Sequence, residues 1–308
     1  MKVLLHIPSK NADEWREAFA RALPEAEIRM WSPGFAWEAD YCAFWQPPRE
    51  LLDGQARIKA AFNLGAGVDA TLKAFALPPG VPLVRLEDAG MGRQMGEYVA
   101  WAVLRYFRRL DDYAAQAARA EWKVHRPRTH AEFPVGVMGL GVLGTRLAKM
   151  LLWLGFPVLG WSANAKTLAE VRTFAGRDGL DAFLGATRAL VCMLPLTPDT
   201  AGLLNRDTLG KLPQGAYLVN VARGGLVVDD DLIAHLDNGH LAGATLDVFH
   251  EEPLPASHRF WTHPKVFLTP HVSALTLVEE SVAQVAGKIR AIERGESITG
   301  VVDPARGY

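Results

Sequence analysis

The chain is organised around residues 134–155, which read Pro-Val-Gly-Val-Met-Gly-Leu-Gly-Val-Leu-Gly-Thr-Arg-Leu-Ala-Lys-Met-Leu-Leu-Trp-Leu-Gly. The apolar run 135–138 predicts a buried strand. Apolar residues then recur at helical spacing from Leu143 to Leu154, and Gly155 and Pro157 end this pattern. A buried strand followed directly by an amphipathic helix is typical of an α/β fold.

The turn between this strand and this helix carries Gly139, Gly141 and Gly144 in G-x-G-x-x-G spacing. In a dinucleotide site the first glycine allows a tight turn, the second lets the backbone approach a pyrophosphate, and the third lets helix pack on strand. The helix N-terminus, at Val142 and Leu143, offers N–H groups to the phosphates. Glycines also mark ordinary turns, but the flanking strand and helix favour a dinucleotide-binding site.

The composition indicates a globular chain with two domains. A length of 308 residues is long for one hydrophobic core, and 49% hydrophobic with 22% charged residues excludes disordered and fibrous classes. The formal net charge of -1 argues against nucleic acid or an anionic membrane as the main partner. The sequence therefore favours a small molecule as the ligand.

The cysteines, the N-terminus and the histidines narrow the class further. Cys42 and Cys192 each lie in an apolar run, as reduced and buried cysteines of a cytoplasmic protein do. The apolar residues after Lys2 are too few for a signal peptide, and no run reaches membrane-spanning length. The histidines show no H-x-x-x-H pair or Cys/His cluster, so we expect no metal site.

Strand and helix signals alternate along the whole chain. We predict strands in the first hundred residues at 3–7, 28–31, 41–45, 61–64 and 83–86, with a helix over 14–23. We predict further strands at 157–161, 189–194, 216–221, 242–248 and 266–268. A long helix over 91–119 is expected to connect the two parts, and a tail after the last helix, 277–294, to return to the first part. This alternation predicts a doubly wound parallel sheet.

The loop after the second strand of the second part bears on the choice of cofactor. An NAD site usually places Asp or Glu there for the ribose hydroxyls, but the first acidic residue is Glu170. Ser162, Asn164 and Lys166 instead suit a 2′-phosphate, with Lys166 supplying the positive charge. An ordinary polar loop is the alternative, and we favour NADPH.

Three residues that can carry chemistry follow three successive strands. Arg223 comes after the strand 216–221 and suits bidentate binding of a carboxylate. Glu252 follows the strand 242–248, and His271 follows the strand 266–268. Each alone is more often a surface residue. Because ligands bind at the carboxyl ends of parallel strands, the three together indicate an active site.

These residues together resemble the D-2-hydroxyacid dehydrogenase family over nearly the whole chain. The resemblance rests on 63–69 (Asn-Leu-Gly-Ala-Gly-Val-Asp), the glycine turn, 220–224 (Asn-Val-Ala-Arg-Gly), 246–249 (Leu-Asp-Val-Phe), 252–254 (Glu-Pro-Leu) and 269–271 (Thr-Pro-His). Residues 85–92 and the ending Ala305, Arg306, Gly307 and Tyr308 resemble the glyoxylate/hydroxypyruvate reductase A branch. That branch tends to carry Arg where Ala163 and Ala165 stand, which leaves Lys166 as the main cation.

The resemblance implies a two-domain architecture with the active site in the cleft. A smaller flavodoxin-like substrate-binding domain would comprise residues 1–98 and 276–308, and a Rossmann-type dinucleotide-binding domain residues 99–275. It also implies a homodimer through the cofactor domain, with 91–119 and the following arm as candidate contacts.

The resemblance also assigns roles to residues. His271 would protonate the substrate carbonyl as hydride arrives, Glu252 would hold His271 protonated, and Arg223 would grip the keto acid. The implied cofactor-binding residues are Gly139, Gly141, Val142, Leu143, Trp161, Ser162, Asn164, Lys166, Leu194, Pro195, Thr200, Val221, Ala222, Arg223, Asp247, His271 and Ser273. The implied substrate-binding residues are Trp45, the backbone N–H groups of Leu64, Gly65, Ala66 and Gly67, and Arg223 with His271. Core packing is an equal alternative for Trp45.

The leading interpretation is an NADPH-dependent reductase of glyoxylate and hydroxypyruvate. Other 2-keto acids with longer side chains are the nearest rivals as substrates. A formate dehydrogenase would place Gln at position 252, and a methyltransferase does not suit the His271 segment. A non-catalytic NADPH-sensing protein is the alternative from another class, although a sensor would not need Arg223, Glu252 and His271 together.

Overall fold

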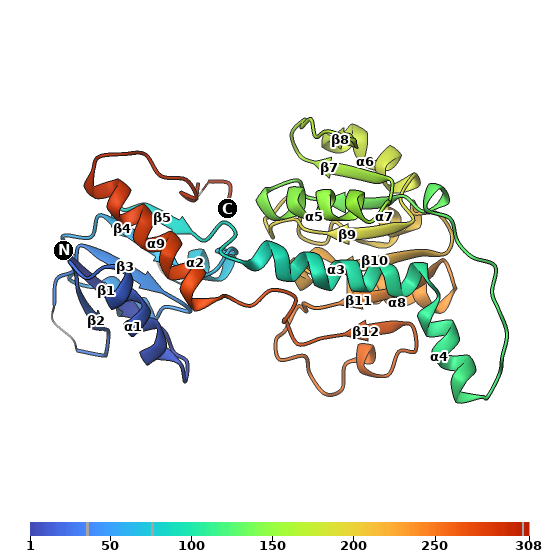
Figure 1. The fold of residues 1–308 in the computed structure, drawn as a ribbon, viewed down its shortest axis with the longest axis horizontal. Helices are drawn as coiled ribbons and strands as arrows, with labels where there is room; N and C mark the ends of the chain where they lie inside the picture. Colours follow the sequence, from blue (N-terminus) through green and yellow to red (C-terminus); the bar gives the residue numbers. More distant parts are fainter. Residues whose placement is uncertain (35–36, 75–76, 304, 308) are drawn as a thin grey trace. The chain divides into compact units, whose positions relative to one another are not determined.

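The computed structural model describes residues 1–34, 37–74, 77–303 and 305–307. Tyr308, the last residue of the C-terminal motif, lies outside the described residues. The chain divides into two compact units, Met1–Met91 with Thr276–Tyr308, and Gly92–Leu275 (Figure 1). The predicted boundary at 98/99 falls inside helix α3 (Met91–Phe107), whereas the division lies where this helix begins.

The first unit contains a five-stranded parallel sheet in the order β2-β1-β3-β4-β5. This is the flavodoxin-like strand order, as predicted. Its elements are β1 (Lys2–His6), α1 (Ala12–Ala22), β2 (Glu27–Met30), β3 (Tyr41–Phe44), β4 (Ala60–Asn63), α2 (Asp69–Ala74), β5 (Leu83–Arg85) and α9 (Val278–Glu293).

The C-terminal tail returns to the first unit. The Arg85 N–H donates to the Gly300 carbonyl at 2.9 Å, and the Val302 N–H donates to the Leu83 carbonyl at 2.8 Å. These bonds add a short antiparallel segment to the edge of β5, where Val84 faces Val301. The prediction for the tail is therefore confirmed.

The second unit contains a seven-stranded parallel sheet in the order β12-β11-β10-β9-β6-β7-β8. The sheet is doubly wound, because the chain runs outward from β6 in one direction to β8 and in the other direction to β12. Besides α3, its elements are α4 (Leu110–Ala118), β6 (Val135–Met138), α5 (Val142–Trp153), β7 (Val158–Ser162), β8 (Val171–Ala175), α6 (Gly176–Gly185), β9 (Ala189–Cys192), α7 (Arg206–Gly210), β10 (Ala216–Asn220), α8 (Asp229–Asp237), β11 (Leu241–Leu246) and β12 (Val266–Leu268).

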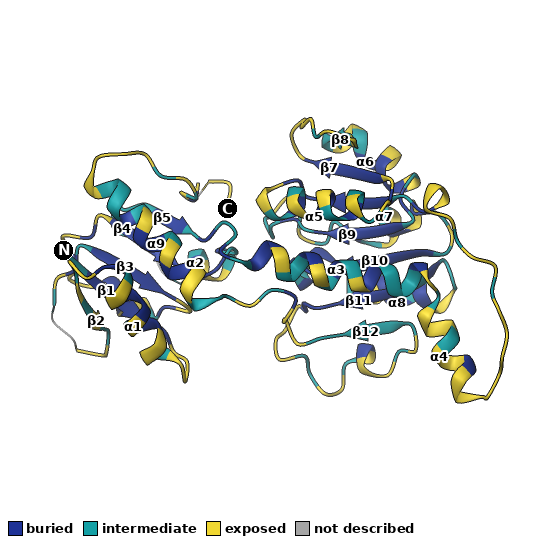
Figure 2. Ribbon diagram, viewed as in Figure 1, coloured by how far each residue is buried: buried dark blue, intermediate teal, exposed yellow. Residues whose placement is uncertain are grey.

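Helices cover both faces of this sheet, and its central strands β6, β7, β9 and β10 are buried, whereas the edge strands β8 and β12 are only partly buried (Figure 2). The two faces alternate along each strand, as the pleat of a strand requires. In β9, Ala189 and Val191 join the core under α3 and α5, whereas Leu190 and Cys192 join the core under α6, α7 and α8. The central strands therefore read as continuous apolar runs in the sequence.

One local prediction was wrong, and one strand was not predicted. The helix predicted over 91–119 is broken, because Arg109 adopts the left-handed region at φ 57° and separates α3 from α4. Strand β8 was not predicted, because its burial is only partial and its Arg-Thr centre lacks an apolar run.

Cys42 and Cys192 are buried and free of disulfides. Within the described residues, no helix combines the length and apolarity needed to cross a membrane.

Candidate active site

The glycine turn lies at the point where the strand order of the second unit reverses, between β6 and β9. Gly139 has φ 112°, and a Cβ at this position would lie 2.7 Å from the Met193 carbonyl oxygen. A Cβ on Gly144 would lie 1.9 Å from the Gly139 carbonyl oxygen. These two glycines are therefore required by the close packing of the turn itself.

Gly141 differs from these two glycines. Apart from its own chain neighbours, no atom of the described residues lies within 4 Å of a Cβ built at Gly141, and the neighbouring Val142 is 45% exposed. Gly141 is also the N-cap of α5, and no side chain caps this helix end. Open space beside helix N–H groups is the arrangement that pyrophosphate binding needs, so the residues present fit a dinucleotide.

The loop after β7 lies against the glycine turn. The Lys166 ammonium donates to the Leu140 carbonyl at 2.5 Å, so its charge is held beside the turn. Ser162 is buried and donates to the Asn164 carbonyl at 2.7 Å, and the Trp161 indole donates to the Gly176 carbonyl at 2.9 Å. Trp161 and Ser162 therefore shape the loop, and Asn164 and Lys166 lie on its exposed side.

The other predicted cofactor residues follow β9, β10 and β11. Leu194, Val221 and Ala222 are buried, which suits an apolar wall of a cofactor site better than polar contacts with the cofactor. The Thr200 hydroxyl donates to the Pro195 carbonyl at 2.7 Å and accepts the Thr197 N–H at 2.8 Å. These bonds stabilise the loop 195–200 itself. Contacts of these residues with a cofactor remain predictions.

Asp247 is fully buried at the end of β11 and holds the segment that carries His271. Its carboxylate accepts the Val272 N–H and the Ser273 N–H, each at 2.8 Å, and the Thr269 hydroxyl at 2.5 Å. Its carbonyl accepts the His271 N–H at 2.8 Å. The observed role of Asp247 is thus to position this segment, and its predicted contact with the cofactor remains a prediction.

His271 and Glu252 are brought together as predicted. The His271 Nδ1 lies 2.7 Å from Glu252 Oε2, and Nδ1 is the donor because a carboxylate only accepts. Glu252 is itself fixed by the Phe249 N–H, which donates to its other oxygen at 2.9 Å. The His271 ring is 44% exposed, and within the described ranges no protein group bonds its Nε2. This nitrogen is therefore available to a ligand.

Arg223 follows β10, which lies next to β11 in the sheet. The Asn220 amide donates to the Arg223 carbonyl at 2.9 Å, and its oxygen accepts the Ala222 N–H at 3.1 Å. A Cβ on Gly224 would lie 1.9 Å from the Phe249 carbonyl carbon, so only glycine allows the Arg223 turn to approach the loop that carries Glu252. The carboxyl ends of β10 and β11 thus share one edge of the sheet.

The predicted substrate turn lies in the first unit, after β4. Trp45 is 41% exposed and packs over Gly65, where a Cβ would lie 2.5 Å from the indole ring. The predicted use of the Leu64 N–H for the substrate does not hold, because this group continues the sheet and donates to the Phe44 carbonyl at 2.8 Å. Any other contact of Leu64 with the substrate stays a prediction. Among the described residues, no protein acceptor bonds the N–H groups of Gly65, Ala66 and Gly67.

Two buried asparagines that shape these turns were missed by the sequence reasoning. Asn63 donates to the carbonyls of Gly65 and Gly67 at 2.9 and 3.1 Å, and Asn220 braces the turn at Arg223 as described above. Each is the last residue of a buried strand. An Asn at that position, followed by a Gly-rich or Arg-containing turn, was the signal available in the sequence.

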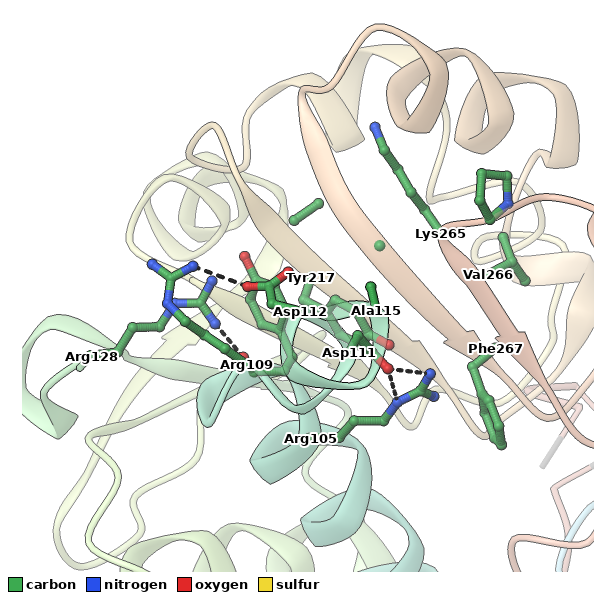
Figure 3. Close-up of a pocket in the computed structure, with 14 residues that line it drawn as sticks. Arg105, Arg109, Asp111, Asp112, Ala115, Arg128, Tyr217, Lys265, Val266 and Phe267 are labelled. Carbon is green, nitrogen blue, oxygen red and sulfur yellow. Dashed lines mark hydrogen bonds and ion pairs between the residues drawn. The ribbon is translucent and has the colours of Figure 1, made fainter. Parts of the chain in front are cut away.

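A separate cavity of about 560 Å³ lies at the amino ends of β10, β11 and β12 (Figure 3). Two of its cations form ion pairs, since Arg105 contacts Asp111 at 2.6 Å and Arg109 contacts Asp112 at 3.1 Å. The other two, Arg128 and Lys265, donate to the main-chain carbonyls of Tyr106 and Leu236. None of the predicted catalytic, cofactor or substrate residues lines this cavity. In the described residues, no group of three or more His, Cys, Asp and Glu is placed to hold a metal ion.

Comparison with known proteins gives one consistent result. Residues 100–273 match the model of the D-isomer specific 2-hydroxyacid dehydrogenase NAD-binding domain. The chain is 46% identical to a glyoxylate/hydroxypyruvate reductase A of Serratia proteamaculans and 47% identical to one of Salmonella paratyphi B, and each match covers 100% of both chains.

Two solved structures show the same fold. One is a D-isomer specific 2-hydroxyacid dehydrogenase of Xanthobacter autotrophicus in complex with NADPH, with 39% identity and a TM-score of 0.94 over 99% of both chains. The other is an NADPH-dependent glyoxylate/hydroxypyruvate reductase of Sinorhizobium meliloti in complex with NADP, with 37% identity and a TM-score of 0.92 over 100% of this chain and 99% of that one.

The contrast between the glycines predicts two different defects. Gly141→Ala should leave thermal stability unchanged but weaken NADPH binding about tenfold or more, because its methyl group occupies the space for the phosphates. Gly144→Ala should destabilise the fold by about 1–3 kcal/mol, because its methyl group meets backbone. Thermal unfolding without cofactor and fluorescence titration with NADPH measure the two effects. Wild-type NADPH affinity in Gly141→Ala would contradict the assignment.

Proposed function

We propose that this chain, which belongs to the D-isomer specific 2-hydroxyacid dehydrogenase family, is an NADPH-dependent reductase of small 2-keto acids. Its reactions would be the reduction of glyoxylate to glycolate and of hydroxypyruvate to glycerate. The observation that carries the proposal is the His271–Glu252 contact at 2.7 Å, in the unit whose glycine turn is open at Gly141.

Bound NADPH supplies the hydride that is added to the keto carbon. His271 is the general acid: Nε2 donates its proton to the carbonyl oxygen, while Nδ1 stays on Glu252. The carboxylate of Glu252 stabilises the charged imidazolium and fixes the ring orientation. Arg223 binds the keto acid and stabilises the negative charge that develops on its oxygen.

The first unit supplies the proposed grip on the substrate carboxylate. Three consecutive N–H groups at Gly65, Ala66 and Gly67 can together bind an anion. The Asn63 amide stabilises their turn by donating to the carbonyls of Gly65 and Gly67. The ring of Trp45 lies directly over Gly65, where it would limit the length of the substrate side chain. This favours two- and three-carbon acids over longer ones.

The second unit supplies the proposed cofactor site. Gly139, Gly141, Val142 and Leu143 would cradle the pyrophosphate, and Asn164 and Lys166 would bind the 2′-phosphate of NADPH. The walls of this site would be formed by Trp161, Ser162, Leu194, Pro195, Thr200, Val221 and Ala222, and Asp247 and Ser273 would complete it. The position of Lys166 beside Leu140 supports the choice of NADPH over NADH.

We further propose that two chains form a homodimer, as the family resemblance implies, and that the protein is cytoplasmic. The arm between α4 and β6 carries Trp122, which is 99% exposed, and Val124, which is 80% exposed. Because these two large apolar side chains lie two residues apart on one arm, we take this arm as the candidate surface for a partner to cover. The two buried free cysteines support a reducing compartment.

The first experiment is a spectrophotometric panel of 2-keto acids with NADPH and NADH. We expect NADPH oxidation with glyoxylate and hydroxypyruvate, and we expect His271→Ala to lower kcat by about a hundredfold or more. A longer 2-keto acid as the best substrate would replace the substrate assignment. No oxidation with any acid would favour the NADPH-sensing alternative.

A second experiment tests the cofactor preference. Lys166→Ala should raise the KM for NADPH about tenfold and leave the KM for NADH nearly unchanged, because only NADPH carries the 2′-phosphate. Lys149→Ala, which removes an exposed lysine of α5, is the matched control. Equal changes in both KM values would place the 2′-phosphate elsewhere.

A third experiment tests the oligomer. Light scattering should give twice the chain mass of 33.7 kDa for the wild type. Trp122→Glu should shift the equilibrium toward the single chain, because it places a charge in a dry contact. Arg177→Glu, on the exposed side of α6, is the charge control. A wild type of single-chain mass at micromolar concentration would refute the dimer.

A further inference from the structure

The hydrogen bonds around Asp247 extend to helix α3. The Tyr98 hydroxyl lies 2.5 Å from the Thr269 hydroxyl, which lies 2.5 Å from Asp247 Oδ1. The direction of these hydrogen bonds follows from chemistry. A carboxylate only accepts, so the single Thr269 hydroxyl proton is donated to Asp247, and in its bond with Tyr98 the Thr269 oxygen can only accept. Tyr98 therefore donates to Thr269, and Thr269 donates to Asp247.

Hydrogen bonds hold most residues of the segment that carries His271. Tyr98 holds Thr269 at its start, and Asp247 holds His271, Val272 and Ser273. One turn before Tyr98 on α3, the Gln94 side chain donates to the Leu275 carbonyl at 2.9 Å and accepts the Leu275 N–H at 3.2 Å.

This fastening is needed because His271 has φ 55°. The left-handed region is unfavourable for a residue with a Cβ, so it persists only where the surroundings impose it. Loosening the segment would let the backbone relax and would move the imidazole away from Glu252. The geometry of the general acid thus depends on groups that the ring itself does not touch.

We infer that Tyr98 and Thr269 are positioning residues for the general acid, acting through Asp247 to hold His271 in the geometry for proton donation. This inference rests on the proposed function and adds two residues to it. Burial, together with the charge of Asp247, raises the pKa of Tyr98 to about 12, so its hydroxyl stays protonated in any ordinary assay. Tyr98 therefore remains a donor throughout the pH range of the reaction.

The same unit offers a matched control. The Tyr217 hydroxyl lies 2.8 Å from the Thr245 hydroxyl, and both residues are buried on β10 and β11. Within the described residues, no hydrogen bond joins this pair to the His271 segment. Tyr217→Phe therefore removes a tyrosine–threonine hydrogen bond without affecting the proposed positioning.

The kinetic test compares Tyr98→Phe, Thr269→Val, Thr269→Ser and Tyr217→Phe in the full chain. We expect Tyr98→Phe and Thr269→Val to lower kcat about tenfold or more and to increase the solvent deuterium isotope effect on kcat. The KM for NADPH should stay within about threefold of the wild-type value. Thr269→Ser keeps the hydroxyl and should restore kcat to within about threefold. Adding Tyr98→Phe to Thr269→Val should lower kcat no further, because both substitutions interrupt the same series of hydrogen bonds from Tyr98 to Asp247.

Two kinetic outcomes would each overturn the inference: a kcat in Tyr98→Phe no lower than in Tyr217→Phe, or a Thr269→Ser variant as slow as Thr269→Val. Histidine-selective ¹⁵N NMR gives a readout that needs no substrate, with the His271 signal assigned from His271→Gln. Its Nδ1–H resonance should shift in Tyr98→Phe and Thr269→Val but not in Tyr217→Phe. If the wild type reduced no 2-keto acid, the proposed function would fail, and an unchanged resonance would separately overturn the positioning role.

Discussion

The buried carboxylate of Asp247 is the interaction on which the site depends. It is fully buried, and it is compensated by N–H donors from Val272 and Ser273 and by the Thr269 hydroxyl. A buried carboxylate without these donors would strongly destabilise the fold, so the folded chain must bring the donors to Asp247. The result is a backbone that holds His271 in the left-handed region and turns its ring toward Glu252.

The rest of the site follows from how parallel sheets end. In the second unit the strand order reverses between β6 and β9, and the connections that follow these two strands lead to helices on opposite faces of the sheet, which is where an α/β sheet leaves room for a ligand. Gly139 and Gly144 make the turn possible, and Gly141 leaves it open. In the first unit the turn after β4 lies away from the reversal of strand order and is braced by Asn63. Among the described residues, no protein acceptor bonds the N–H groups of Gly65, Ala66 and Gly67 in this turn.

Much of this was predictable from the sequence, because buried parallel strands are continuous apolar runs and ligand residues follow them. The contact of His271 with Glu252 was anticipated in that way. The role of Tyr98 was not, because a tyrosine on an amphipathic helix gives no sign of its partner 171 residues away in the chain. Likewise, the use of the Leu64 N–H within the sheet depends on register, and the break at Arg109 depends on a backbone conformation that no residue type there announces.

The central claim is that His271, aimed by Glu252 and Asp247, is the proton donor to the carbonyl oxygen of a 2-keto acid. A crystal structure of the chain with NADP⁺ and oxalate, which resembles the substrate but cannot react, tests this claim most directly. The account predicts His271 Nε2 within about 3.2 Å of an oxalate oxygen, with Nδ1 still on Glu252. Oxalate bound without His271, or a His271 ring that has left Glu252, would contradict it.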